Sequence, residues 1–149
     1  MPWSLTYSNS QLAPGGYFEA QDLVMATSDD GTLRKDSDLQ TYIDTLTHAM
    51  QLAGRPLTAA KEWKGLLEAA GFEDVVERPF KWPTNTWPRD PRYKTLGKWC
   101  MYNMEQLLEP ALLAPATRIL GWTPEEAIAL ADKAKKVLRD TSVHAYWPM

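Results

Sequence analysis

A short polar group follows an apolar-aromatic run near the beginning of the chain. A Pro-Gly-Gly turn precedes this run, and the run ends in Glu19, Gln21 and Asp22. Ligands of open α/β sheets bind beyond the carboxyl ends of strands. Glu19 is therefore a candidate catalytic residue, and Gln21 and Asp22 are candidates for binding a substrate. Ordinary polarity at a strand end is the alternative interpretation.

A second candidate group lies at the other end of the chain. His144 and Tyr146 stand in the closing segment VHAYWP. The pKa of a histidine lies near neutrality, which suits proton transfer, and a tyrosine hydroxyl can donate a hydrogen bond. Both are candidate catalytic residues, although a histidine before a strand can also be purely structural. His48 is expected to be solvated or to lie at a helix end.

The sequence predicts no metal site and no disulfide. Its two histidines and single cysteine, Cys100, do not have the spacing of metal ligands. A lone cysteine cannot form an internal disulfide, which favours a reducing compartment. Cys100 itself is expected as a small packed residue on the apolar face of a helix.

Aromatic residues are unusually frequent. The chain has seven tryptophans and six tyrosines, and aromatic side chains line many small-molecule pockets. The candidate substrate pocket consists of Trp82, Trp87, Tyr93, Trp99 and Asn103. The alternative is that these side chains serve packing in the core and at interfaces.

Hydrophobic periodicity, caps and turn residues predict the elements that would position these side chains. In chain order we expect a strand at 17–24, helices at about 37–53 and 58–70, a strand at 72–78, a stiff Pro/Trp loop at 81–91, helices at about 91–108, 110–120 and 123–139, and a strand that begins at 143. The capping box Thr123-Pro124-Glu125-Glu126 marks the firmest boundary. We expect a single domain, 1–149, with cap helices at about 37–70 and C-terminal helices at about 90–139.

Composition restricts the class of protein. The net charge of −3 gives no basic face for nucleic acid. No apolar run approaches the roughly 20 residues that span a bilayer, and the beginning of the chain does not look like a secretory signal. We therefore expect a cytoplasmic globular protein that binds neither nucleic acid nor membranes.

Six stretches in this order resemble one protein family. They are LAPGGYFEAQDL, SDDGTL, GRPLTAAKEWKGLLEAAGFEDVVERPFKWP, WPRDPRYKTLGKWCMYNMEQLLE, RILGWTPEEAIAL and VHAYWP. Together they resemble the C-terminal half of fungal class I S-adenosylmethionine-dependent methyltransferases, a group that includes methyltransferase-like regulators of secondary metabolism. The resemblance implies a helix-rich α/β fold, a truncated Rossmann-like arrangement with few strands and a helical substrate cap.

The resemblance also bears on the cofactor. In the family, the glycine-rich loop and the acidic residue that hold S-adenosylmethionine would precede the segment that matches this chain. We therefore expect no cofactor, and S-adenosylmethionine only if a partner chain supplies the missing half. The strand at 17–24 lies inside the family's sheet, so its free edge would favour pairing into a homodimer or heterodimer.

Three functions remain open from the sequence. The first is a natural-product enzyme that binds a small hydrophobic or aromatic metabolite and promotes a cyclisation or isomerisation without a cofactor. The second is half of a methyltransferase that a partner chain completes. The third is a non-catalytic module that regulates a full-length relative.

Overall fold

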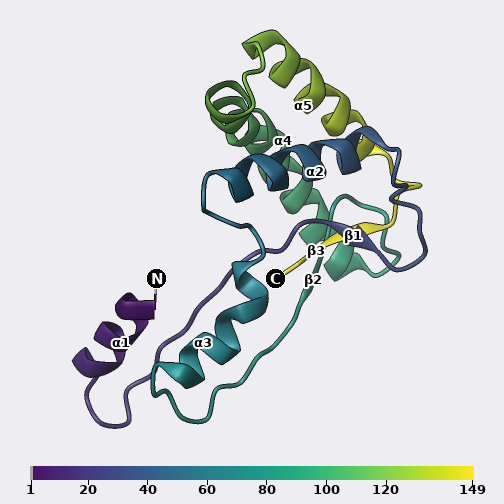
Figure 1. Ribbon diagram of the computed structural model, residues 1–149. Helices are drawn as coiled ribbons and strands as arrows, with labels where there is room; N and C mark the ends of the chain where they lie inside the picture. Colours follow the sequence, from purple (N-terminus) through teal and green to yellow (C-terminus); the bar gives the residue numbers. More distant parts are fainter. Residues whose placement is uncertain (1) are drawn as a thin grey trace.

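The computed structural model describes residues 2–149, which form a compact body and a thinner arm (Figure 1). The elements, in chain order, are α1 (Pro2–Gln11), β1 (Thr27–Ser28), α2 (Asp38–Leu52), the 3-10 helix η1 (Ala59–Glu62), α3 (Trp63–Ala69), β2 (Lys81–Pro83), α4 (Pro91–Ile119), α5 (Pro124–Arg139) and β3 (Ala145–Pro148). The body contains α2, α4, α5 and the strands. The arm contains α1, α3 and two long extended segments.

The core lies where α2, α4 and α5 pack together. Each helix contributes a stripe of buried residues, among them Leu39 from α2, Leu112 from α4 and Leu138 from α5, all fully buried. Tyr42 joins two of the helices, because its buried hydroxyl donates a hydrogen bond of 2.8 Å to the carbonyl of Leu108. The helix-rich character that the sequence predicts is confirmed.

A small antiparallel sheet closes one end of this core. The strand order is β1-β3-β2, with Thr27 opposite Tyr146 and Trp82 opposite Trp147. Successive side chains of a strand point to opposite faces. Trp147 therefore enters the core, where it is buried, while Tyr146 projects from the other face of β3. This alternation places Tyr146 in the candidate site.

Local capping explains why two of the predicted helices are confirmed. The side chain of Ser37 accepts a hydrogen bond from the backbone of Gln40 at the start of α2. At the start of α5, Thr123 and Glu126 form the reciprocal capping box that the sequence predicts. The final strand and the helical segment around 58–70 are also present, the latter as η1 and α3.

The predicted break between helices at 91–108 and 110–120 is wrong. One helix, α4, runs through both segments and contains Pro110 and Pro115. An internal proline costs a helix one hydrogen bond. On either side of these prolines, the buried residues Met104, Leu108 and Leu112 continue the same stripe against the core, and this packing keeps the helix continuous.

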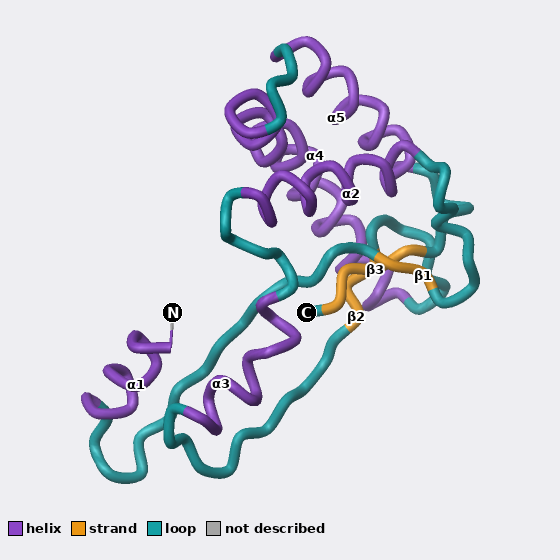
Figure 2. Tube along the Cα trace, viewed as in Figure 1, coloured by secondary structure: helices purple, strands orange, loops and turns teal. Residues whose placement is uncertain are grey.

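The predicted strands at 17–24 and 72–78 are also wrong. Both segments are drawn as loop in Figure 2 and run along the arm without strand pairing. A strand needs a hydrogen-bonded neighbour, and the one such link of residues 17–24 to the sheet is the Val24 backbone N–H, which donates to the carbonyl of Pro148 at 2.8 Å. Tyr17 is 96% exposed.

The loss of the strand at 17–24 affects the predicted dimer. A dimer that pairs through a strand at 17–24 loses the strand on which it depends, so association with a second chain stays a prediction without that mechanism. The assignment of residues 1–149 to one domain stays a prediction too.

No helix within residues 2–149 is long and apolar enough to cross a membrane.

Candidate functional site

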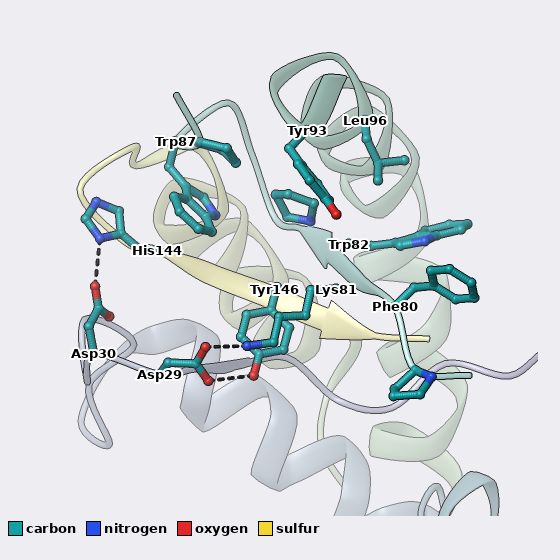
Figure 3. A pocket seen from close by; sticks show the side chains of 13 residues that line it. Asp29, Asp30, Phe80, Lys81, Trp82, Trp87, Tyr93, Leu96, His144 and Tyr146 are labelled. Carbon is teal, nitrogen blue, oxygen red and sulfur yellow. Dashed lines mark hydrogen bonds and ion pairs between the residues drawn. The ribbon is translucent and has the colours of Figure 1, made fainter. Parts of the chain in front are cut away.

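A pocket of about 540 Å³ opens where the loop after β1, strands β2 and β3, and the start of α4 meet (Figure 3). Its lining has two chemical characters. Five aromatic side chains line it, namely Phe80, Trp82, Trp87, Tyr93 and Tyr146. Four ionisable side chains lie among them, namely Asp29, Asp30, Lys81 and His144. An aromatic pocket with a few convergent polar groups is the usual form of a small-molecule site.

His144 and Asp30 form an acid–base pair at this pocket. The Nδ1 atom of His144 lies 2.7 Å from a carboxylate oxygen of Asp30. Thr32 holds both partners, because its hydroxyl donates to Asp30 at 2.7 Å and accepts from the backbone N–H of His144 at 2.8 Å. Thr32 therefore fixes the pair, and the three residues join two segments that are far apart in the chain.

The ionisation of Asp30 determines the tautomer of His144. Hydrogen bonds from Thr32, and then from His144, lower the pKa of Asp30 from 3.8 to about 2. Asp30 is thus a carboxylate at neutral pH and can only accept, so the Nδ1–H of His144 donates to it. The Nε2 atom is left as the basic nitrogen. Because the pKa of Asp30 is lowered in the folded protein, the pair stabilises the site above about pH 4 and is lost as the pH falls toward 2.

A second polar cluster surrounds Asp29. The hydroxyl of Tyr146 donates to Asp29 at 2.7 Å, and the ammonium of Lys81 contacts the other carboxylate oxygen. The hydrogen bond from Lys81 is the main reason why the pKa of Asp29 is lowered, and the same contact raises the pKa of Lys81. Asp29 in turn raises the pKa of Tyr146, so that Tyr146 stays a neutral hydrogen-bond donor.

Two hydrogen bonds hold one wall of the pocket, the side chain of Trp87, against the body. The indole N–H of Trp87 donates to the carbonyl of Ala145 at 2.8 Å, which places its ring 5.1 Å from the ring of His144. The backbone N–H of Trp87 donates to the side chain of Asn85 at 2.9 Å. Asn85 is fully buried, so Trp87 is anchored in the body at two points.

The structure brings together five of the ten candidate site residues that the sequence analysis names. Trp87, Tyr93, His144 and Tyr146 all line the pocket, as does Trp82 of the predicted aromatic group. The other five lie elsewhere. Trp99 and Asn103 are exposed on α4, while Glu19, Gln21 and Asp22 are exposed on the arm. No residue of the expected cap helices at 37–70 lines this pocket.

The three predicted residues of the arm have local partners. The side-chain amide of Gln21 donates to Glu19 at 2.7 Å. Asp22 accepts from the indole N–H of Trp63 at 2.9 Å and so ties the extended segment to α3. These contacts describe links within the arm, and whether Glu19, Gln21 and Asp22 act on a ligand stays a prediction.

Sequence reasoning missed Asp29, Asp30 and Lys81. The two acids precede Gly31, a pattern typical of a turn, and Lys81 lies in the segment 81–91 that the sequence predicts as a stiff loop. The spacing of these residues gave no sign that β3 would lie between them. The motif SDDGTL, one of the stretches that carry the family resemblance, was the one sequence signal that could have pointed to Asp29 and Asp30.

Two other kinds of chemistry find no support in the structure. The described part of the chain has no group of three or more His, Cys, Asp and Glu side chains placed to hold a metal ion. Cys100 is buried in the core, and burial raises the pKa of its thiol to about 11. It is a packed residue rather than a reactive thiolate.

Comparison with known proteins identifies relatives in fungi. The chain is 36% identical over 141 residues to the probable methyltransferase tdiE of Emericella nidulans, an alignment that covers 94% of this chain and 44% of tdiE. It is 33% identical over 137 residues to the methyltransferase pytC of Aspergillus terreus, covering 91% of this chain and 42% of pytC. It is 34% identical over 140 residues to the secondary metabolism regulator LAE1 of Cochliobolus heterostrophus, covering 92% of this chain and 46% of LAE1.

The chain thus spans less than half the length of these curated relatives. No family model matches it, and no solved structure matches it either. The resemblance seen in the sequence is nevertheless confirmed by several relatives with the same kind of description. Over nearly all of its residues, the chain is homologous to a C-terminal part of the fungal methyltransferases and methyltransferase-like regulators of secondary metabolism.

Proposed function

We propose that this methyltransferase-derived protein binds a small hydrophobic or aromatic metabolite of a natural-product pathway and promotes its cyclisation or isomerisation without a cofactor. The observation that carries the proposal is the pair of His144 and Asp30 at the edge of an aromatic pocket. The names of the relatives supply the link to secondary metabolism. The descent from a truncated Rossmann-like methyltransferase fold is part of the same proposal.

The arrangement suits a proton transfer within one substrate. Asp30 orients His144 so that its Nε2 accepts a proton from one position of the substrate and returns it to another. The product then has the composition of the substrate, and no oxidant, reductant or second substrate takes part. The aromatic walls would hold a planar substrate in one orientation. The hydroxyl of Tyr146, which donates its proton to Asp29, would accept a hydrogen bond from a polar group of the substrate and so orient it.

We predict that His144→Gln strongly slows conversion. Deletion of the gene should make the producing strain accumulate a compound with the same mass as the normal product, and purified protein should convert it. A positioned general base contributes about 10²–10⁴-fold to a rate, so we expect a loss of at least about 100-fold for His144→Gln. Liquid chromatography with mass detection measures both isomers.

His48→Gln is the matched control, because His48 is exposed on α2 and lies outside the pocket. It should keep the full rate. A folded His144→Gln variant that converts the compound at the wild-type rate would contradict the proposed role of His144. A deletion strain with an unchanged metabolite profile would contradict the function itself.

A second candidate function is a methyltransferase half that a partner chain completes, or a module that regulates a full-length relative. The observation that favours it is the match to less than half of each relative. Several of these relatives are described as methyltransferases or regulators. In both forms of this alternative, a second chain would contribute the cofactor site.

We predict that the 149-residue chain alone does not bind S-adenosylmethionine. Its adjacent glycines, Gly15 and Gly16, follow α1 and lead into an extended segment, whereas a nucleotide-type cradle joins a strand to a helix. Isothermal titration calorimetry at sub-millimolar cofactor should show no saturable heat. A micromolar dissociation constant for the isolated chain would overturn this prediction and favour the methyltransferase function.

A further inference from the structure

Two carboxylates and one ammonium lie among the ionisable groups of the pocket. Asp29 and Asp30 both have lowered pKa values and are carboxylates at neutral pH. Lys81 is the single permanently charged cation among the lining residues that the structure describes. The two carboxylates of the lining therefore outnumber its one permanently charged cation. The side chains of Asp29 and Asp30 are 67% and 45% exposed, so a ligand can reach both carboxylates.

The aromatic walls favour the same sign of ligand charge. The face of an aromatic ring carries a negative potential and attracts cations within about 6 Å. The protein itself shows this interaction, because the ammonium of Lys81 lies 4.5 Å from the centroid of the Tyr146 ring while it contacts Asp29. Asp29 and the ring of Tyr146 thus already bind one ammonium group together, that of Lys81.

Most of the aromatic lining has no cation of the protein beside it. Among the residues described, the one pair of this kind is Lys81 with Tyr146. Phe80, Trp82, Trp87 and Tyr93 line the same pocket. Figure 3 shows Trp87, Tyr93 and Trp82 in a row along the side of the pocket away from Asp29 and Asp30, with Trp87 beside His144. A ligand between the two sides would contact rings on one side and carboxylates on the other.

We propose that the pocket selects an aromatic ligand that carries an alkylammonium group, with its ring among Trp82, Trp87 and Tyr93 and its ammonium directed to Asp29 and Asp30. This inference rests on the proposed function and specifies the class of metabolite. A carboxylate ligand of the same size meets two like charges in the pocket. A neutral ligand gains the contact with the rings but not the interaction of its charge with the carboxylates.

Three probes of one shape and different charge test the inference. They are naphthylmethyl-trimethylammonium, naphthylmethanol and naphthylacetate, each titrated into the full chain and followed by NMR chemical shifts at low ionic strength. Cation–π and carboxylate contacts together favour the cation by about 10-fold or more over the neutral probe. We expect affinity to fall in the order cation, neutral, anion.

Two variants change the charge of the lining in opposite directions. Asp30→Asn removes a carboxylate and should weaken the cationic probe about 5-fold, within the range for a partly exposed charge contact. Lys81→Gln removes the resident ammonium and should strengthen the same probe. Neither should change the affinity of the neutral probe. Asp132→Asn is the control, because Asp132 pairs with Lys135 on α5 outside the pocket and should leave all three affinities unchanged.

Equal affinity for the three probes would overturn the inference and leave a general aromatic pocket, as the proposed function requires. Tighter binding of the anion, or loss of affinity for the neutral probe in folded Asp30→Asn, would overturn it as well. So would the failure of all three probes to bind. The proposed function is judged separately, by the conversion assay with His144→Gln.

Discussion

Gly97→Ala is expected to lower the free energy of unfolding by about 3 kcal/mol and to deform the pocket. Gly97 is buried in α4, and a Cβ atom there would lie 1.9 Å from the carbonyl oxygen of Asn85 and 2.8 Å from its carbonyl carbon. It would also lie 3.2 Å from the Cβ of Pro83. Backbone atoms cannot yield as a flexible side chain does, so α4 must move away from the loop after β2. Overpacking of this kind costs about 1–3 kcal/mol or more.

The displacement would reach the site because both sides of the contact belong to it. Tyr93 and Leu96 line the pocket from the same turns of α4, and Pro83 lines it from β2. Urea unfolding followed by circular dichroism measures the loss of stability, and the cationic probe should bind more weakly to whatever fraction remains folded. The expected change in the midpoint follows from the free energy and the slope of the transition.

Gly65→Ala is the matched control for this substitution. Gly65 lies in α3, and a Cβ atom there would have no atom within 4 Å. Alanine is favoured over glycine in a helix by about 0.5–1 kcal/mol, so stability should be unchanged or slightly higher. If Gly97→Ala unfolded at the wild-type urea concentration, α4 could not lie as close to Asn85 as described.

Asn85→Ala is expected to cost about 3 kcal/mol, because one buried amide satisfies three backbone groups. Its Nδ2 atom donates to the carbonyls of Leu138 and Asp140 at 3.0 and 2.9 Å, where α5 ends. Its Oδ1 accepts from the backbone of Trp87. A buried group that loses its partner costs about 1–3 kcal/mol. Thermal unfolding should show the loss, and the NMR signal of the Trp87 indole N–H should report a less rigid pocket.

Asn103→Ala removes the same side chain from an exposed position of α4. Substitutions at such sites stay within about 0.5 kcal/mol, so this variant should unfold at the wild-type temperature. A similarly small effect for Asn85→Ala would show that the end of α5 and the loop of Trp87 are held by other contacts. It would also remove the proposed link between the helical core and the pocket.

A chain of contacts connects the buried Asn85 to the proposed base His144. Asn85 fixes Trp87, Trp87 packs on His144, and His144 is held by Asp30 and Thr32. These contacts join the loop of Asn85 and Trp87 to His144, and His144 to the loop of Asp30 and Thr32. A perturbation of the buried amide therefore changes the orientation of the proposed base without touching it.

The sequence alone determined those features that depend on residues close together in the chain. The capping box at Thr123 spans four residues, and the stripe Leu39, Tyr42, Ile43 and Leu46 repeats within two turns, so α5 and α2 were predictable. The prediction of α4 began correctly at Asp90, whose side chain accepts from the backbone of Arg92 and Tyr93. Aromatic frequency and the VHAYWP segment also directed attention to Trp87, Tyr93, His144 and Tyr146.

Tertiary structure decided what depends on partners far away in the chain. Residues 17–24 and 72–78 have the composition of strands, but no neighbouring strand pairs with them, and they remain extended. Pro110 and Pro115 would end an isolated helix, but α4 continues through both because it packs on the core. Asp29 and Tyr146 are separated by 117 positions in the sequence, and only the antiparallel pairing of β1 with β3 brings them together. The pocket thus depends on long-range pairing, which local sequence patterns do not encode.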